Sequence, residues 1–225
     1  MRGGPYALPF AALRDASGKH LIERHSLRVA PSIGTVVELE ARAASRPLAA
    51  ASAVVVGNPA FNGWALQLPS AEVEARKVYG ELAGAEYAAS KKLGAAATKA
   101  AVVEAMKGCD VVHLATHGTA DGVLLSGATL AEGKLSMGEV QSLELRARLV
   151  VLSECDSFRG KLTADGVIGI TRAFVAAGAL SLVASLWKVD DGATRELMER
   201  FYTSGCLRAA RWATWRRRCR ARWSR

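Results

Sequence analysis

The sequence predicts an α/β fold in which a mainly parallel sheet is covered by helices on both sides. Two observations carry this prediction. Short apolar runs alternate with helix-like segments from residue 52 onward, and those runs are apolar at consecutive positions, which is typical of strands buried on both faces. The chain has 225 residues, half of them hydrophobic, and is therefore long enough to bury one sizeable core.

The region before residue 52 is predicted to be extended chain with one turn, followed by a connector. Asp15, Ser17 and Gly18 supply turn chemistry between the two apolar halves of YALPFAALRDASGKHLIERHSLRVAPS. The alanine-rich residues that follow are interpreted as the connector. The β-branched run SAVVVGNP, residues 52–59, ends in glycine, asparagine and proline, which indicates a buried strand.

Two helices are predicted after that strand. Ser70 can cap a helix that runs to about Leu82, and Glu72 and Glu74 lie in its first turn, where the helix dipole favours acids. The apolar positions of this helix share one face: Ala71, Ala75, Val78, Tyr79 and Leu82. The segment ATKAAVVEAMKG, residues 97–108, predicts the second helix.

Two further strands are predicted in the middle of the chain. The first covers residues 110–116 and is followed by a glycine-rich loop. A short helix is expected over 136–143, and the second strand covers 148–153. Each of these strands ends next to a residue capable of chemistry.

The last regular elements are predicted as a helix, a strand and a helix. Asp165 is interpreted as the cap of a helix that Gly178 stops. The apolar run LSLVASLW, residues 180–187, indicates a buried strand. Asp190 or Asp191 opens the final helix.

The positive charge of the chain is concentrated at its end. Residues 206–225 hold eight arginines and no acid, so the formal net charge of +9 falls to +1 for residues 1–205. Nucleic acid is therefore not an expected partner of the body. Tryptophan and arginine alternate in the tail without a helical period, which favours a solvated or artefactual segment over a platform for stacked bases.

Cysteine usage and hydropathy predict a reducing, cytoplasmic compartment and no membrane association. The four cysteines form no CxxC pair, and the N-terminus lacks the pattern of a signal peptide. The longest uncharged run, residues 173–187, is shorter than the roughly 18 residues that a membrane span needs, and Gly178 interrupts it.

His117 and Cys155 each follow an apolar strand, in the segments VVHLATHG and RLVVLSEC. Ligands of parallel α/β sheets gather at the carboxyl ends of the strands, so neighbouring strands would bring the two side chains together. A thiol is mostly protonated at neutral pH, and an adjacent imidazole can make it a nucleophile. The backbone N–H groups of Gly118 and Cys155 could then form an oxyanion hole.

Simpler interpretations compete with this dyad. A cysteine at a strand end is usually a small buried hydrophobe, and a single histidine is usually a structural residue. The spacing of His113 and His117 fits a metal pair, but HLATH lacks the glutamate of HExxH, so we expect neither a metal nor another cofactor. On a strand, His113 points with the core, and we expect it to pack beside His117 and orient it.

The segments HLATHG and LSEC resemble those of the CHAT domain, a caspase-like module often attached to tetratricopeptide repeats. The flanks LPFAALRDASGKHLIERHSLRVAPS and GVIGITRAFVAAGALSLVASLWKVDDGAT are also similar to the family. The likeness covers roughly residues 5–204, which we take as the domain, with an Arg/Trp-rich tail over 205–225. The family domain generally begins further upstream, so we expect this copy to be incomplete at its N-terminus.

The resemblance implies a caspase-like three-layer α/β/α sandwich and a cysteine endopeptidase that acts on protein substrates. His117 corresponds to the family's general base and Cys155 to its nucleophile. It also implies control by an attached tetratricopeptide-repeat region or a regulatory partner. By similarity to separases, Asp156 and Asp165 could bind a basic residue beside the scissile bond, although a helix cap is the preferred interpretation of Asp165.

One departure from the family pattern supports an alternative function. Glu154 replaces the small residue that often precedes the nucleophile, and a carboxylate facing the thiol would oppose thiolate formation. The alternative is an inactive scaffold that keeps the fold and binds other proteins. The presence of both His117 and Cys155 favours the peptidase.

Overall fold

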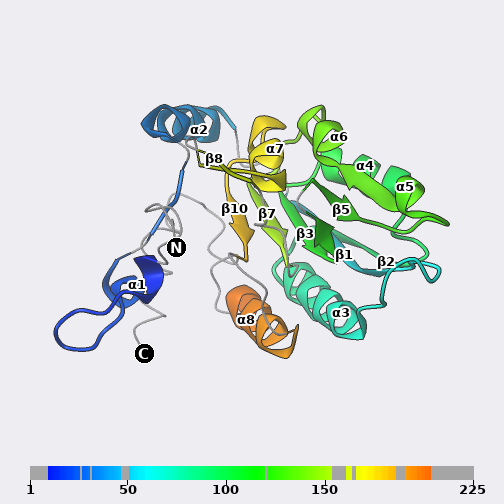
Figure 1. Cartoon of the computed structure of the whole chain (residues 1–225), viewed down its shortest axis with the longest axis horizontal. Helices are drawn as coiled ribbons and strands as arrows, with labels where there is room; N and C mark the ends of the chain where they lie inside the picture. The colour runs from blue at the N-terminus through cyan, green and yellow to red at the C-terminus, as the bar shows by residue number, and fades with distance from the viewer. Residues whose placement is uncertain are drawn as a thin grey trace.

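The computed structural model of the chain has a five-stranded, wholly parallel sheet at its centre (Figure 1). The residues that it describes are 10–25, 27–30, 32–46, 51–119, 121–153, 161–163, 166–185 and 191–203. In spatial order, the strands are β10 (Leu182–Ala184), β7 (Leu149–Leu152), β3 (Val111–Ala115), β1 (Ser52–Pro59) and β2 (Ala88–Gly94). The sequence predicts each of them except β2. This strand lacks a continuous apolar run, because it contains the exposed Lys91.

Helices cover both faces of this sheet, which confirms the three-layer α/β/α sandwich (Figure 1). One face packs against α3 (Pro69–Gly84) and α8 (Asp191–Thr203). The other face packs against α4 (Lys99–Lys107), α6 (Met137–Gln141) and α7 (Ile170–Ala176). Strand residues alternate between the two apolar clusters: Val54 and Val56 belong to the second face, and Val55 belongs to the first, as the two-residue period of a strand requires.

The N-terminal region contains more helix than the sequence predicts. The turn is confirmed, because the Asp15 carboxylate accepts from the Ser17 backbone N–H at 2.8 Å and Gly18 has a φ of 78°. Around it lie η2 (Phe10–Ala12) and α1 (Leu21–Arg24), where extended chain is expected. The prediction of a connector before β1 is wrong over the described residues, because helix α2 (Ile33–Ser45) lies there. The Ser32 hydroxyl caps this helix.

The glycine-rich loop after β3 is also more ordered than predicted. It forms a small antiparallel sheet of β4 (Gly118–Thr119), β5 (Gly122–Leu124) and β6 (Lys134–Ser136), with α5 (Leu130–Gly133) before β6. A separate hairpin joins β8 (Lys161–Thr163) and β9 (Gly166–Ile168). The small sheet is built around β5, which bonds to the main chain of His117 and so bears on the site below.

Two of the predicted helix caps are wrong. Helix α3 begins at Pro69, whose missing N–H suits the first helical position, so Ser70 lies inside the helix. Helix α7 begins at Ile170 after Gly169, too late for Asp165 to cap it; Asp165 itself is outside the described residues. The short helix expected over 136–143 is present as α6, which Ser136 caps with a reciprocal bond from Glu139.

The end of α7 also follows the prediction. Gly178 has a φ of +116°, a conformation that L side chains rarely adopt, and the helix ends just before it. No helix in the described part of the chain is both long enough and apolar enough to cross a membrane.

Candidate active site

His117 lies at the carboxyl edge of the sheet, two residues beyond the end of β3. Its backbone carbonyl accepts from the Leu124 N–H of β5 at 2.9 Å, so the small antiparallel sheet fixes its main chain. Its side chain is half-buried. The strand therefore delivers this imidazole to the edge where parallel α/β sheets bind their ligands.

A backbone carbonyl determines which nitrogen of His117 carries the proton. The Nε2 atom lies 2.8 Å from the Leu66 carbonyl oxygen. A carbonyl oxygen only accepts hydrogen bonds, so Nε2 must be the donor. In the neutral ring, Nδ1 then holds the lone pair and is the atom able to accept a proton.

Residues 61–68, which we name the histidine shelf, support that carbonyl. The fully buried Phe61 ring packs against the His117 ring at a centroid distance of 5.2 Å and against the Trp64 ring at 5.1 Å. The Trp64 Nε1 and Asn62 Nδ2 atoms both donate to the Gly127 carbonyl, at 2.9 and 3.0 Å. The shelf is thereby tied to the connection between β5 and α5.

Asn58 ties the other end of the shelf to helix α3. Its φ of 43° is in the left-handed region, which asparagine tolerates better than most residues. Its Oδ1 atom accepts from the Leu68 N–H at 2.6 Å, and its Nδ2 atom donates to the Glu72 carboxylate at 3.3 Å. The Arg76 guanidinium and this Asn58 bond lower the pKa of Glu72, consistent with a carboxylate that remains charged and accepting.

The strand that leads to Cys155 is the direct neighbour of β3. β3 and β7 pair in parallel, with His113 opposite Val151, and the Ser153 N–H donates to the Leu114 carbonyl at 2.9 Å. This adjacency confirms the premise of the predicted dyad. Cys155 and its neighbours Glu154 and Asp156 lie outside the described residues, so the distance between thiol and imidazole stays a prediction.

Gly118 follows His117 as the first residue of β4 and pairs with Val123 of β5. Its position beside the imidazole at the sheet edge is the one that the sequence predicts. Its role as an oxyanion donor stays a prediction. Asp165, the weaker candidate for substrate binding, also lies outside the described residues.

His113 is fully buried in the middle of β3 and contacts a different set of residues. Its Nε2 atom lies 2.9 Å from Glu74 Oε1, and its Nδ1 atom lies 3.0 Å from the Tyr202 hydroxyl. Core packing of His113 is therefore confirmed. Because both ring nitrogens bond to these two residues, His113 makes no hydrogen bond to His117, and its predicted role in orienting His117 stays a prediction.

The roles of Glu74 and Tyr202 are not predicted from the sequence. One signal was present for Glu74: it lies four residues before Val78 and eight before Leu82, on the apolar stripe of α3. An acid on that stripe implies a buried partner. Burial and the nearby Glu74 charge raise the pKa of Tyr202 well above its ordinary value, so its hydroxyl stays protonated.

The described thiol of Cys109 contrasts with the one expected at the site. Its side chain is buried and donates to the Ala105 carbonyl at 2.9 Å. Burial raises its pKa to about 11. Since the thiolate is the reactive form, Cys109 is a slow nucleophile at neutral pH.

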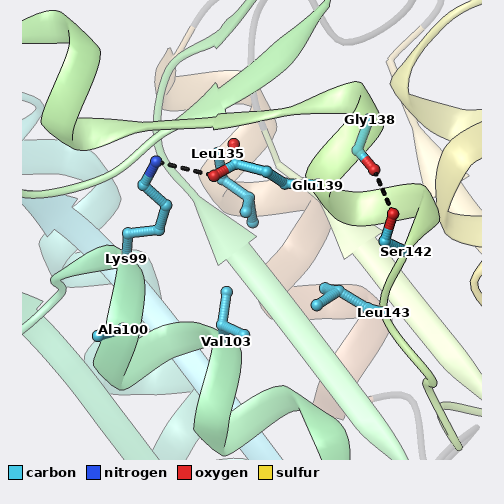
Figure 2. Close-up of a pocket in the computed structure, with 8 residues that line it drawn as sticks. All are labelled: Lys99, Ala100, Val103, Leu135, Gly138, Glu139, Ser142 and Leu143. Atoms are coloured by element: carbon cyan, nitrogen blue, oxygen red, sulfur yellow. Dashed lines mark hydrogen bonds and ion pairs between the residues drawn. The ribbon is translucent and has the colours of Figure 1, made fainter.

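A hollow of about 680 Å³ lies away from His117, between α4 and α6 (Figure 2). Val103, Leu135 and Leu143 line it, and the Lys99–Glu139 ion pair spans its rim at 3.0 Å. No histidine or cysteine lines it, so it provides neither member of the dyad. Among the described residues, no three His, Cys, Asp or Glu side chains cluster in a way that could hold a metal ion.

Comparison with protein families gives one match across nearly the whole chain. A family model described as "CHAT domain" matches residues 2–213. Curated relatives include tetratricopeptide repeat protein 28 from Homo sapiens, 31% identical over 256 residues, and its Mus musculus counterpart, 28% identical over 256 residues. Each alignment covers 91% of this chain and 10% of the relative, so the chain spans about a tenth of the relatives' length.

Comparison with solved structures supports the fold. The Arg-specific cysteine proteinase gingipain R superposes with a TM-score of 0.50 at 11% identity, over 71% of this chain and 37% of gingipain. At that identity, the likeness concerns the fold alone.

Proposed function

This chain belongs to the CHAT domain family, and from that premise we propose that it is a cysteine endopeptidase with His117 and Cys155 as its catalytic dyad. The observation that carries the proposal is the bond from His117 Nε2 to the Leu66 carbonyl. It leaves Nδ1 as the basic atom at the carboxyl edge of β3, next to the strand that leads to Cys155.

In the proposed mechanism, His117 Nδ1 takes the proton of the Cys155 thiol, and the thiolate attacks the carbonyl carbon of a peptide bond. The backbone N–H groups of Gly118 and Cys155 stabilise the oxyanion that forms. His117 then returns the proton to the leaving amine. Water, with His117 again as base, hydrolyses the thioester and releases the acid.

The Leu66 carbonyl contributes to this cycle without reacting. When His117 carries both protons, its Nε2–H bond to that carbonyl becomes charge-assisted and therefore stronger. The same bond prevents the ring from turning its lone pair away from the thiol. The shelf acts, in this proposal, as the third member of the catalytic group.

We further propose that Asp156 and Asp165 bind a basic substrate residue, and that the domain is regulated by tetratricopeptide repeats in cis or by a separate partner. The curated relatives are named for such repeats, and the matched region is a tenth of their length. A reducing, cytoplasmic compartment suits a catalytic thiol, which must stay free of disulfides.

Thiol labelling tests the proposal directly. We expect iodoacetamide at pH 6 to 7 to label Cys155 of the folded wild type faster than it labels N-acetylcysteine, with the site identified by mass spectrometry. In His117→Ala, the Cys155 rate should fall by about 100-fold, the lower end of the range for general-base effects. Cys109, with its pKa of about 11, is the internal reference for a buried thiol.

The opposite result would support the scaffold function. If folded wild-type protein labels Cys155 no faster than N-acetylcysteine, and His117→Ala changes nothing, the chain is not a peptidase of this mechanism. If labelling is fast, a library of peptides with varied residues before the cleaved bond would follow. Preference for arginine or lysine that is lost in Asp156→Asn would support the proposed role of Asp156.

A further inference from the structure

Two hydrogen bonds connect the same pair of segments. The first segment contains β3 and the residues after it, and it carries His113 and His117. The second contains the shelf and α3, and it carries Leu66 and Glu74. His113 bonds to Glu74 at 2.9 Å inside the core, and His117 bonds to the Leu66 carbonyl at 2.8 Å at the edge.

These two bonds are mechanically linked because α3 begins at Pro69, between Leu66 and Glu74. A helix is stiff over this length, so a shift of α3 along β3 would move Glu74 and the shelf together. Gly57 of β1 allows α3 to approach the sheet closely: a Cβ there would collide with the Ala75 side chain and lie 2.9 Å from the Ala71 carbonyl. The position of α3 is therefore one determinant of where the Leu66 carbonyl lies relative to His117, together with the Gly127 bonds at the other end of the shelf.

Helix α8 joins this arrangement through Tyr202. Its hydroxyl lies 3.0 Å from His113 Nδ1, and the two rings meet edge to face at 5.4 Å. On the same helix, Glu199 pairs with Lys77 of α3 at 2.7 Å. Helix α8 therefore contacts both β3 and α3.

The donors and acceptors of the buried network can be matched without leaving any of the three groups unpaired. Glu74 and Tyr202 are each 3% exposed, and His113 is 0% exposed. A neutral His113 with its proton on Nε2 donates to the Glu74 carboxylate, and its Nδ1 accepts from the Tyr202 hydroxyl. Because an unpaired charge is very costly in the core, the three groups form or break their bonds together.

We propose that Glu74, His113 and Tyr202 are positioning residues, through which the docking of α8 holds α3 in the place that sets the Leu66 carbonyl on His117 Nε2. The network touches neither substrate nor thiol. It acts through the shelf, by keeping His117 in the tautomer whose Nδ1 is free to accept a proton. The effect of the network on catalysis rests on the peptidase function proposed above, but its effect on the His117 tautomer does not.

The test compares Tyr202→Phe with Tyr79→Phe in the full chain. Tyr79→Phe is the matched control, because it removes a hydroxyl from α3, on the same face of the sheet, without touching the network. The first readout is the ¹⁵N chemical shifts of the His117 ring, which report the fraction protonated on Nε2. The second is the rate of iodoacetamide labelling at Cys155.

We expect wild-type His117 to be mainly in the Nε2–H tautomer. Tyr202→Phe should lower that fraction and slow Cys155 labelling by on the order of tenfold, a typical size for coupling between sites. Tyr79→Phe should change neither. In a second pair, Glu74→Gln keeps an acceptor oxygen and should retain more of the wild-type tautomer than Glu74→Leu.

The inference is overturned if Tyr202→Phe and Glu74→Leu lower the melting temperature yet leave the His117 tautomer and the Cys155 rate unchanged, since the network would then be structural only. If Tyr202→Phe does not fold, the Glu74→Gln and Glu74→Leu pair gives the same decision. A wild type with a slow Cys155 would contradict the peptidase proposal, while the tautomer fractions would still decide this one.

Discussion

The middle of β3 and its carboxyl end each present a histidine, only four residues apart, and the two sites are built differently. In the middle, His113 is fully buried and bonds to two side chains that come from α3 and α8. At the end, His117 is half-buried and bonds to a main-chain carbonyl of the shelf. The His113 imidazole has both nitrogens occupied, whereas His117 Nδ1 has no hydrogen-bond partner among the described residues.

His113 thus belongs to the packed core of the sheet, whereas His117, just beyond the strand, is the candidate catalytic residue. A buried polar group must find partners, so the core site depends on three particular side chains. The edge site depends on the path of the backbone and on the aromatic ring beneath it. Substitutions at the two positions should therefore fail in different ways.

The largest stability effect is expected for His113→Leu. This change leaves the Glu74 carboxylate buried without its imidazole, which should lower the free energy of unfolding by about 3–5 kcal/mol. His117→Leu, the matched control two residues beyond the end of the strand, should change the free energy by no more than about 1 kcal/mol. Urea unfolding followed by circular dichroism measures both.

Equal losses in the two variants would contradict this difference, because both histidines would then stabilise the fold. The double variant Glu74→Leu/His113→Leu tests the buried pair as a unit. Replacement of a whole buried pair by apolar residues is often close to neutral, so the double variant should be more stable than His113→Leu alone.

Gly57→Ala should affect both regions at once. The new Cβ would collide with Ala75 and crowd the Ala71 carbonyl, pushing α3 away from β1 at a cost of about 1–3 kcal/mol. Since the shelf moves with α3, His117 should also lose part of its Nε2–H tautomer. Unfolding and ring ¹⁵N shifts would be measured on the same sample; a stability loss with unchanged ring shifts would argue against the coupling of shelf and helix.

Trp64→Phe should affect the edge alone. It keeps an aromatic ring beside Phe61 and removes the Nε1 bond to the Gly127 carbonyl, which is worth about 1 kcal/mol. Asn62→Gly is the matched control, because it removes the second, more exposed donor to the same oxygen and tolerates its φ of 49°. Thermal unfolding should show a smaller loss for Asn62→Gly; the reverse order would show that the asparagine holds the shelf.

The smallest effect is expected at Glu139, whose bonds go to Ser136 and Lys99. Bonds from the Ser136 hydroxyl and backbone N–H, with help from Lys99, lower the pKa of Glu139 from its ordinary 4.5 to about 2. The cap that this carboxylate gives α6 is complete above pH 4.5 and is lost as the pH falls toward 2. Glu139→Gln should cost less than about 1 kcal/mol at pH 7 and close to nothing at pH 2. An equal cost at both pH values would show that the charge is not what matters.

The sequence predicts the core strands well because a parallel strand buried on both faces has a distinctive apolar run, as SAVVVGNP does for β1. It misses β2, an edge strand that contains the exposed Lys91, and α2, an amphipathic helix that lies where extended chain and a connector are expected. Cap residues fail where a proline or a glycine begins the helix instead, as at Pro69 and Gly169.

At the site, the sequence predicts that His117 lies at the edge of the sheet, because it follows directly after a predicted strand. That prediction requires only the position of His117 along the chain, not knowledge of its contacts. Its partner could not be predicted in the same way. The Leu66 carbonyl has no side-chain signature, and 51 residues separate it from His117. The His113 network likewise joins residues from three distant elements, which only the fold brings together.

The bond between His117 and Leu66 has a consequence for engineering. Every amino acid has a backbone carbonyl, so the residue type at position 66 is free to vary while the bond persists. The Leu66 side chain is 81% exposed beside the imidazole. Position 66 is thus a convenient attachment point for a fluorophore or an affinity handle, which would report on peptide binding if the proposed peptidase function holds, without removing the carbonyl that bonds to His117.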